Sequence, residues 1–130
     1  MMREILFRGK RVDNGEWVEG CLLYDCEQNE SYIAEYFEDK SAYIREVIPE
    51  TVGQYTGLTD KNGKKIFERD VVKVYLTDGI EIGLIGWSDI DVRFKFASPD
   101  GTAYGIDVTD TLEIIGNIHD NPELLEVDNG

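Results

Sequence analysis

The sequence holds 130 residues with a formal net charge of −14, from 13 lysines and arginines against 27 aspartates and glutamates. A chain this acidic repels phosphate backbones over most of its surface, which argues against direct binding of nucleic acid. No apolar run approaches the roughly 20 residues of a membrane-spanning helix, and basic residues near the N-terminus interrupt any signal-peptide pattern. We therefore expect a cytoplasmic chain with no membrane association.

The first half of the chain has the pattern of paired β-strands. An Asn14-Gly15 pair suits a hairpin turn of type I′, because asparagine tolerates positive φ and glycine adopts it without steric cost. Pro49 ends the run, since proline cannot donate a backbone hydrogen bond to a ladder. The predicted strands are Glu4–Lys10, Glu16–Tyr24, Ser31–Phe37 and Tyr43–Ile48.

The second half repeats this pattern around three further turn pairs, Asn62-Gly63, Asp78-Gly79 and Asp100-Gly101. Apolar residues alternate with polar ones between these turns, which predicts strands with one buried face. Gly83, Gly86 and Gly116 interrupt strand interiors, where a glycine often marks a bulge or a barrel corner. The predicted inward positions are Val72, Val74, Leu76, Ile80, Ile82, Leu84, Val92, Phe94, Phe96, Leu112, Ile114 and Ile118.

These patterns predict an all-β fold. Residues 1–50 would form an N-terminal β-meander, and residues 51–130 a small SH3-like β-barrel, because closing a sheet removes its exposed edges. A single domain over residues 1–130 is the alternative division. The only predicted helix is short and follows Asn121, where Asp120 or Asn121 can cap it and Pro122 suits its first position.

Binding residues are predicted at Gln54, Tyr55 and Thr56, which glycines flank on both sides and which could present an aromatic ring, an amide and a hydroxyl to a partner. In the alternative interpretation, Tyr55 fills the core and its hydroxyl finds a hydrogen-bond partner at an edge. Trp87 could line a groove, or it could anchor a core or a subunit interface.

Catalytic chemistry has few candidates in this chain. His119 is the only histidine, and with the neighbouring Asp120 it could act as a general base, but no nucleophile can be assigned to it. The stretch from Asp60 to Gly63 resembles part of a calcium loop but lacks the distal glutamate. We therefore predict no catalytic residue, no metal site and no cofactor.

Several segments in order along the chain resemble the YopX family of bacteriophage and prophage proteins. The central block, Thr51-Val52-Gly53-Gln54-Tyr55-Thr56-Gly57-Leu58 with Asp60-Lys61-Asn62-Gly63, is the most specific. The other matching segments are Phe7-Arg8-Gly9-Lys10, Trp17-Val18-Glu19-Gly20, Ile66-Phe67-Glu68 with Asp70, Gly86-Trp87, Ile115-Gly116-Asn117-Ile118 and Asn121-Pro122-Glu123-Leu124-Leu125.

One position departs from the family pattern. Arg69 stands where the family has a glycine, and an arginine there argues against a turn with positive φ. The resemblance implies a mainly-β fold, an origin in a phage or mobile element of a bacterium, and self-association. It implies no enzymatic activity and brings no catalytic residues to this chain.

Three functions follow as hypotheses. The first is a non-enzymatic phage or prophage interaction protein that forms a homo-oligomer and binds a host or phage protein. The second is an acidic nucleic-acid mimic that occupies a host DNA-binding protein, with acids spaced like duplex phosphates. The third is a small hydrolase or metal-dependent enzyme that uses His119. The acids of the C-terminal quarter, on which the second depends, are Asp107, Asp110, Glu113, Asp120, Glu123, Glu126 and Asp128.

Overall fold

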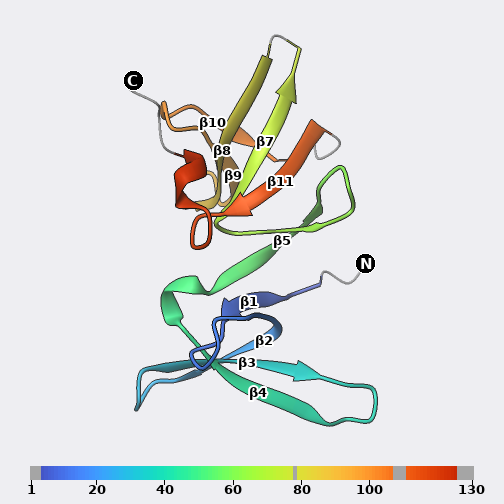
Figure 1. Cartoon of the computed structure of the whole chain (residues 1–130), viewed down its shortest axis with the longest axis vertical. Coiled ribbons are helices and arrows are strands. Elements are labelled where there is room, and N and C mark those ends of the chain that lie inside the picture. Colours follow the sequence, from blue (N-terminus) through green and yellow to red (C-terminus); the bar gives the residue numbers. More distant parts are fainter. Residues whose placement is uncertain (1–3, 78, 107–110, 126–130) are drawn as a thin grey trace. The chain divides into compact units, whose positions relative to one another are not determined.

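A computed structural model describes residues 4–77, 79–106 and 111–125 (Figure 1). The protein is all-β with two antiparallel sheets, which confirms the predicted fold class. The chain forms two compact units, Met1–Tyr55 and Thr56–Gly130. The predicted division after residue 50 stays a prediction, since strand β5 (Gly53–Thr59) runs through this region.

The first unit contains a curled sheet with the strand order β4-β3-β2-β1-β5. Consecutive strands pair in antiparallel fashion, as expected for a meander. The curl brings the end of β4 back to the chain after β1, where Arg11 and Val47 form an isolated bridge. The strands are β1 (Phe7–Lys10), β2 (Trp17–Asp25), β3 (Glu30–Tyr36) and β4 (Ala42–Val47), followed by the start of β5.

The core of the first unit is small. Its fully enclosed apolar side chains are Ile33, Ala34 and Val47, with Tyr55 nearly so. The curl is tight, because a Cβ atom on Gly9 would lie 3.0 Å from the Val47 side chain. Only a residue without a side chain fits this approach unless Val47 moves.

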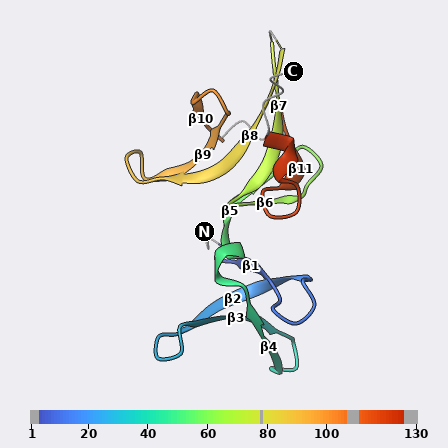
Figure 2. The same ribbon diagram turned by 60° about the vertical axis from the view of Figure 1, so that its left-hand side comes forward.

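The second unit begins with the end of β5, which pairs with β6, and continues into a sheet with the order β10-β9-β8-β7-β11. Figures 1 and 2 show β7 and β8 running side by side. Its strands are β6 (Lys65–Phe67), β7 (Asp70–Leu76), β8 (Gly79–Ser88), β9 (Arg93–Ala97), β10 (Ala103–Gly105) and β11 (Leu112–Asn117).

A continuous apolar cluster forms the core of this unit. Its two aromatic rings, Phe94 and Phe96, come from β9 as the alternation predicted. Strand β11 shifts register between Ile114 and Gly116, which confirms the bulge expected near Gly116. The cluster consists of Ile66, Val72, Ile85, Phe94, Phe96, Ile106 and Leu112, with Val74 and Ile114 packed against it.

The face of strand β8 that packs on the core differs from the predicted one: its odd-numbered residues face inward instead of Ile80, Ile82 and Leu84. Leu76 pairs with Gly79, so only two residues connect β7 and β8. A two-residue connection places even-numbered residues of β7 opposite odd-numbered residues of β8. Ile80, Ile82 and Leu84 therefore lie on the face of Lys73 and Tyr75, away from Val72 and Val74. Asp78, part of the predicted turn, lies outside the described residues.

The asparagine-glycine and aspartate-glycine turns differ from type I′. Gly15, Gly63 and Gly101 have positive φ, but Asn14, Asn62 and Asp100 do not. In two of these turns a loop of three residues is closed by backbone hydrogen bonds: the N–H groups of Asp60 and Ser98 donate to the carbonyls of Lys64 and Thr102 at 2.8 Å. The carbonyls of Asp60 and Ser98 accept from the N–H groups of Gly63 and Gly101 at 3.0 Å. In such loops a type I turn is followed by one left-handed residue, so only the glycine needs positive φ.

Two other turns contradict expectation at single residues. Arg69 adopts φ 74° in the turn between β6 and β7, so the positive-φ turn is kept without glycine. Its backbone N–H donates to the Ile85 carbonyl at 2.8 Å, and its own carbonyl accepts from Ile118 at 2.9 Å. Val92 was predicted to face the core, but it lies in the turn before β9 with φ 53° and is 69% exposed.

Helical structure is limited to short 3₁₀ segments. The predicted C-terminal helix is a 3₁₀ turn at Pro122–Leu125 as far as the described residues extend, and a second 3₁₀ turn at Pro49–Thr51 was not predicted. No helix in the described part of the chain is long and apolar enough to span a membrane. Among those residues, no pairing joins the sheet edges β10 and β11, so the SH3-like closure stays a prediction.

Candidate functional site

The predicted binding residues of β5 have structural roles. Tyr55 is 7% exposed, and its backbone N–H donates to the Leu6 carbonyl at 2.8 Å. Thr56 is 8% exposed, and its hydroxyl donates to the Ile66 carbonyl at 2.9 Å and accepts from the Leu58 N–H at 3.2 Å. Gln54 lies opposite Phe7 on β1 and is partly buried. Binding through these three residues stays a prediction.

Trp87 lies in the second unit, where its ring packs against that of Phe94 and remains partly in solvent. Its ring meets that of Phe94 edge-to-face at 5.0 Å, yet Trp87 is 46% exposed. The neighbouring turn carries Ile90, which is 93% exposed. Both the core role and the binding role predicted for Trp87 are compatible with this geometry, and its use in binding stays a prediction.

His119 and Asp120 belong to a polar turn. The backbone N–H groups of both residues donate to Asn117 Oδ1, at 3.0 and 2.9 Å. The Asn117 amide in turn donates to Asp120 Oδ2 at 3.2 Å. This arrangement stabilises the chain after β11 and gives His119 no assigned nucleophile. In the described ranges, no three His, Cys, Asp or Glu side chains gather closely enough to hold a metal ion.

Asp60 holds the loop between β5 and β6 against β11. Its Oδ1 accepts from the N–H groups of Asn62 and Lys64, both at 2.9 Å, and its Oδ2 accepts from the Ile114 N–H at 3.0 Å. Burial raises the pKa of the Asp60 carboxyl, but these three hydrogen bonds outweigh it and leave the pKa below its ordinary value. The oxygens that suggested a calcium loop therefore bind backbone N–H groups.

The aspartate of the Pro99-Asp100-Gly101 turn is likewise used locally. Asp100 Oδ1 accepts from the Ser98 hydroxyl at 2.6 Å and from the Thr102 N–H at 2.9 Å. These hydrogen bonds lower the pKa of the exposed Asp100 carboxyl to about 2. Four of the acids on which the nucleic-acid mimic depends, Asp107, Asp110, Glu126 and Asp128, lie outside the described residues.

The hairpin of β3 and β4 leaves large apolar side chains in solvent on both of its faces. Tyr43 is 58% exposed on one face, where its ring meets that of Phe37 edge-to-face at 5.2 Å. Ile44 is 58% and Tyr36 61% exposed on the other face. The pairing of β3 with β2 ends at Ala34, so the outer end of the hairpin is two-stranded (Figure 1). We call Tyr36, Phe37, Tyr43 and Ile44 the hairpin tip.

Strand β4 also has an open edge. Its C-terminal end is covered, because Val12 donates to the Glu46 carbonyl at 3.0 Å and Ile48 to the Lys10 carbonyl at 2.8 Å. Backbone groups of alternate strand residues point to the same side, so those of Ala42 and Ile44 point to this edge too. Among the described residues, no strand pairs with the edge at Ala42 and Ile44.

A signal for this surface is present in the sequence. Adjacent apolar pairs at Tyr36-Phe37 and Tyr43-Ile44 place an apolar side chain on each face of the hairpin, whereas a strand with one wet face alternates. The two-residue length of the connection between β7 and β8 is a second signal, for a different site, because it places Glu81 on the core side of β8.

The comparisons with known proteins point to one family. The family model described as "YopX protein" matches residues 6–126. Protein EF1440 from Enterococcus faecalis is similar in structure, with a TM-score of 0.61 and 24% identity over 96% of this chain and all of that chain. YopX from Bacillus subtilis is similar with the same TM-score and coverage at 17% identity. These likenesses show the fold, and no curated protein matches the sequence.

Proposed function

The chain belongs to the YopX family, and we propose that it is a non-enzymatic interaction protein of a bacteriophage or prophage that assembles with copies of itself. The observation that carries the proposal is the open edge of β4, which combines unpaired backbone groups with exposed apolar side chains on both faces. Proteins normally blunt such edges with charges, bulges or a covering segment. Among the described residues, no strand is paired with the edge at Ile44, although the charged Arg45 and Glu46 follow on β4 and Arg11 and Asp13 line a pocket together with Ile44.

The backbone geometry suits a second copy of β4. Two antiparallel β4 strands related by a two-fold axis at Ile44 would exchange N–H···O=C hydrogen bonds between their two Ile44 residues. The pairing would be short, because the Glu46 carbonyl already accepts from Val12. Burial of side chains therefore has to supply most of the stability of the dimer.

The side chains beside Ile44 are complementary under this two-fold axis. Tyr43 of one copy would lie opposite Arg45 of the other, and an arginine over a tyrosine ring is a favourable pair. Within one chain the Arg45 guanidinium already lies 5.0 Å from the Tyr43 ring centroid and 3.2 Å from Glu35 Oε1. The Glu35 carboxylate thus holds Arg45 in a position next to an aromatic ring.

Burial of the hairpin tip would drive dimerisation, and the net charge of the chain opposes it. A two-stranded ribbon is marginal on its own, so covering both faces of the hairpin tip stabilises the hairpin as well as the contact. The chain charge of −14 repels a second copy. Salt screens that repulsion, so self-association should strengthen as the salt concentration rises.

Sedimentation of the wild type and two variants at low and high salt tests the proposal. Ile44→Lys places a charge at the centre of the contact and should give a monomer at both salt concentrations. Ile90→Lys is the matched control, because Ile90 is exposed in the second unit, and it should sediment like the wild type. A monomeric wild type at high salt, or an equal loss of association in both variants, would contradict the proposal.

A further inference from the structure

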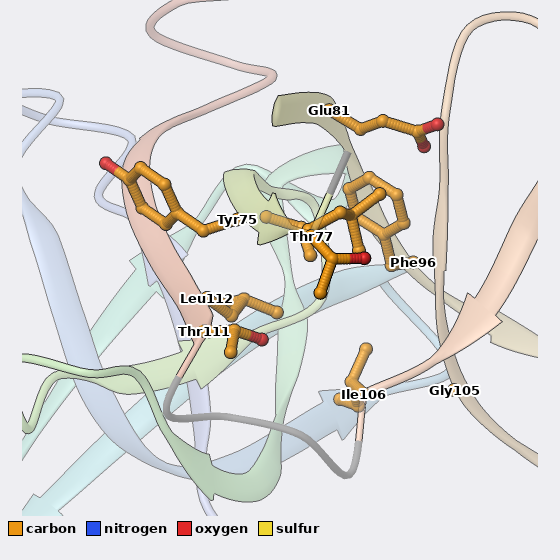
Figure 3. A pocket seen from close by; sticks show the side chains of 10 residues that line it. Tyr75, Thr77, Glu81, Phe96, Gly105, Ile106, Thr111 and Leu112 are labelled. Carbon is orange, nitrogen blue, oxygen red and sulfur yellow. The ribbon is translucent and has the colours of Figure 1, made fainter. Parts of the chain in front are cut away.

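A cavity of about 350 Å³ opens at one end of the core in the second unit. Most of its wall is apolar, and it lies beside the Val74–Leu76 end of β7 (Figure 3). The ring of Tyr75 points away from the other labelled side chains, and the Lys61 ammonium lies 4.5 Å from its centroid. The side chains that line the cavity from the core side are those of Val74, Phe96, Ile106 and Leu112.

Glu81 is the only ionisable carboxyl group on the described wall of this cavity. Strand pairing sets Val74 directly between Glu81 on β8 and Leu112 on β11, so the three side chains share the inner face of the sheet. The next inner-face residue of β8 is Gly83, where a Cβ atom would lie 2.5 Å from the Phe96 ring. The absence of a side chain at Gly83 thus lets the aromatic ring lie beside the carboxylate position.

One oxygen of Glu81 is buried without a hydrogen-bond donor. Glu81 Oε2 is enclosed, and within residues 4–77, 79–106 and 111–125 no group donates a hydrogen bond to it. A buried carboxylate oxygen without a donor is unfavourable, and such an atom in a folded protein calls for a specific explanation. A donor from outside the chain would relieve this cost.

We propose that this cavity is a binding site for a small amphiphilic amine. Its apolar part would lie against Phe96, Ile106 and Leu112. Its ammonium group would donate a hydrogen bond to the Glu81 carboxylate, once a rotation of that side chain turns Oε2 towards the cavity. Ligand pockets are mostly apolar with a few polar groups that fix orientation, and the cavity lies at the small end of their usual range of about 300–1,000 Å³. A positively charged donor forms a stronger hydrogen bond with a carboxylate than a neutral one does.

Titration of the full chain with n-hexylamine, followed by two-dimensional NMR, tests the site. n-Hexanol has the same apolar chain with a neutral donor, and hexanoate has an anionic end. The amine should bind saturably and shift the amide signals of Val74, Glu81, Phe96 and Leu112. It should bind more tightly than the alcohol, and hexanoate should bind least.

Three variants assign the binding to this cavity. Glu81→Gln should lower the affinity for hexylamine about ten-fold or more, because a hydrogen bond to a charged group is lost. The affinity for hexanol should change little. Asp89→Asn removes an exposed acid from the same unit and should leave amine binding unchanged, which separates a specific contact from general attraction to an acidic protein. Leu76→Trp enlarges a half-exposed wall residue and should block both ligands.

The proposal is overturned if the wild type shows no saturable shifts with hexylamine. It is also overturned if Glu81→Gln and Asp89→Asn weaken the binding of hexylamine equally. Equal affinities for hexylamine and hexanol would overturn it too, because they would show that the donor to Glu81 is water and not the ammonium group. Heat unfolding of each variant checks that it is folded. Because this site lies in the second unit, sedimentation of Glu81→Gln should match the wild type whatever the ligand result.

Discussion

The two units of the chain treat their apolar side chains differently. In the second unit, seven apolar residues form one buried cluster, and both rings of β9 lie inside it. In the first unit, Ile33, Ala34 and Val47 are enclosed, while three aromatic rings of the β3–β4 hairpin, Tyr36, Phe37 and Tyr43, remain in solvent. The second unit also exposes large apolar side chains, such as Trp87, Ile90 and Val92, but it has the larger buried core. The first unit encloses few apolar side chains and leaves those of its hairpin to be covered by something else.

This difference separates stability from association. Core residues of the second unit should determine how stable the chain is, because large buried side chains contribute most to the free energy of unfolding. Residues of the hairpin tip should determine whether copies associate, with little effect on the stability of a single chain.

Removing one ring from each unit gives the largest contrast. Phe96 is 2% exposed, so Phe96→Ala should lower the free energy of unfolding by about 3–5 kcal/mol. Tyr43 is 58% exposed, so Tyr43→Ala should change the free energy of unfolding of the isolated chain by less than about 0.5 kcal/mol. Urea unfolding at low protein concentration measures both. Equal losses would show that the hairpin belongs to the core of the single chain.

Replacing Asp60 should have the next largest effect on the free energy of unfolding, because its carboxylate links the β5–β6 loop to β11. Asp60→Asn turns an N–H donor towards at least one of its backbone N–H partners and should cost about 1–3 kcal/mol. The native pKa of Asp60 is lowered. Its stabilisation is therefore complete above the unfolded pKa of about 3.9 and is lost as the pH falls through the native value.

The variant should consequently lose less stability on acidification than the wild type does. Unfolding free energies at neutral pH and at a pH below the native pKa of Asp60 provide the comparison. If wild type and variant lose the same stability between the two pH values, the hydrogen bonds to Ile114 and the loop do not favour the ionised carboxyl.

Two turns of the second unit should respond in opposite directions. Gly63 has φ 82° with open space around it, so Gly63→Val is penalised by the backbone alone, by about 1–2 kcal/mol. Arg69 adopts φ 74° without being glycine, so Arg69→Gly relieves the same strain. The gain should be at most about 1 kcal/mol, since glycine loses more backbone freedom on folding. Heat-unfolding midpoints should therefore fall for the first variant and rise slightly for the second.

Local patterns in the sequence were sufficient to predict the all-β fold and the family. The turn glycines at 15, 63 and 101 and the rings at Phe94 and Phe96 lie where alternation and turn chemistry indicated. The inward face of β8 was wrong, because it depends on the length of the connection after Leu76 and not on the apolar residues themselves. The predictions for Val92 and Arg69 were wrong because tertiary hydrogen bonding and strand pairing override the φ preference of a single residue.

The candidate surfaces were harder to predict, since each depends on contacts between distant segments. Gln54, Tyr55 and Thr56 stood out by composition, yet Tyr55 and Thr56 are buried by their neighbours. The open edge at Ile44 depends on where the curl of the sheet stops covering β4. The position of Glu81 in an apolar wall depends on three strands meeting in one register.

Hydrogen exchange at the Ile44 amide distinguishes an open β4 edge from an edge that a second copy of the chain covers. This N–H points to the open edge of β4, so in a single chain it should exchange quickly, whereas amides of Val72 and Ile85 in the second unit should be protected. At high protein concentration and high salt, a second copy should protect the Ile44 amide and leave Val72 and Ile85 unchanged. Equally fast exchange of the Ile44 amide at every protein concentration would contradict the account.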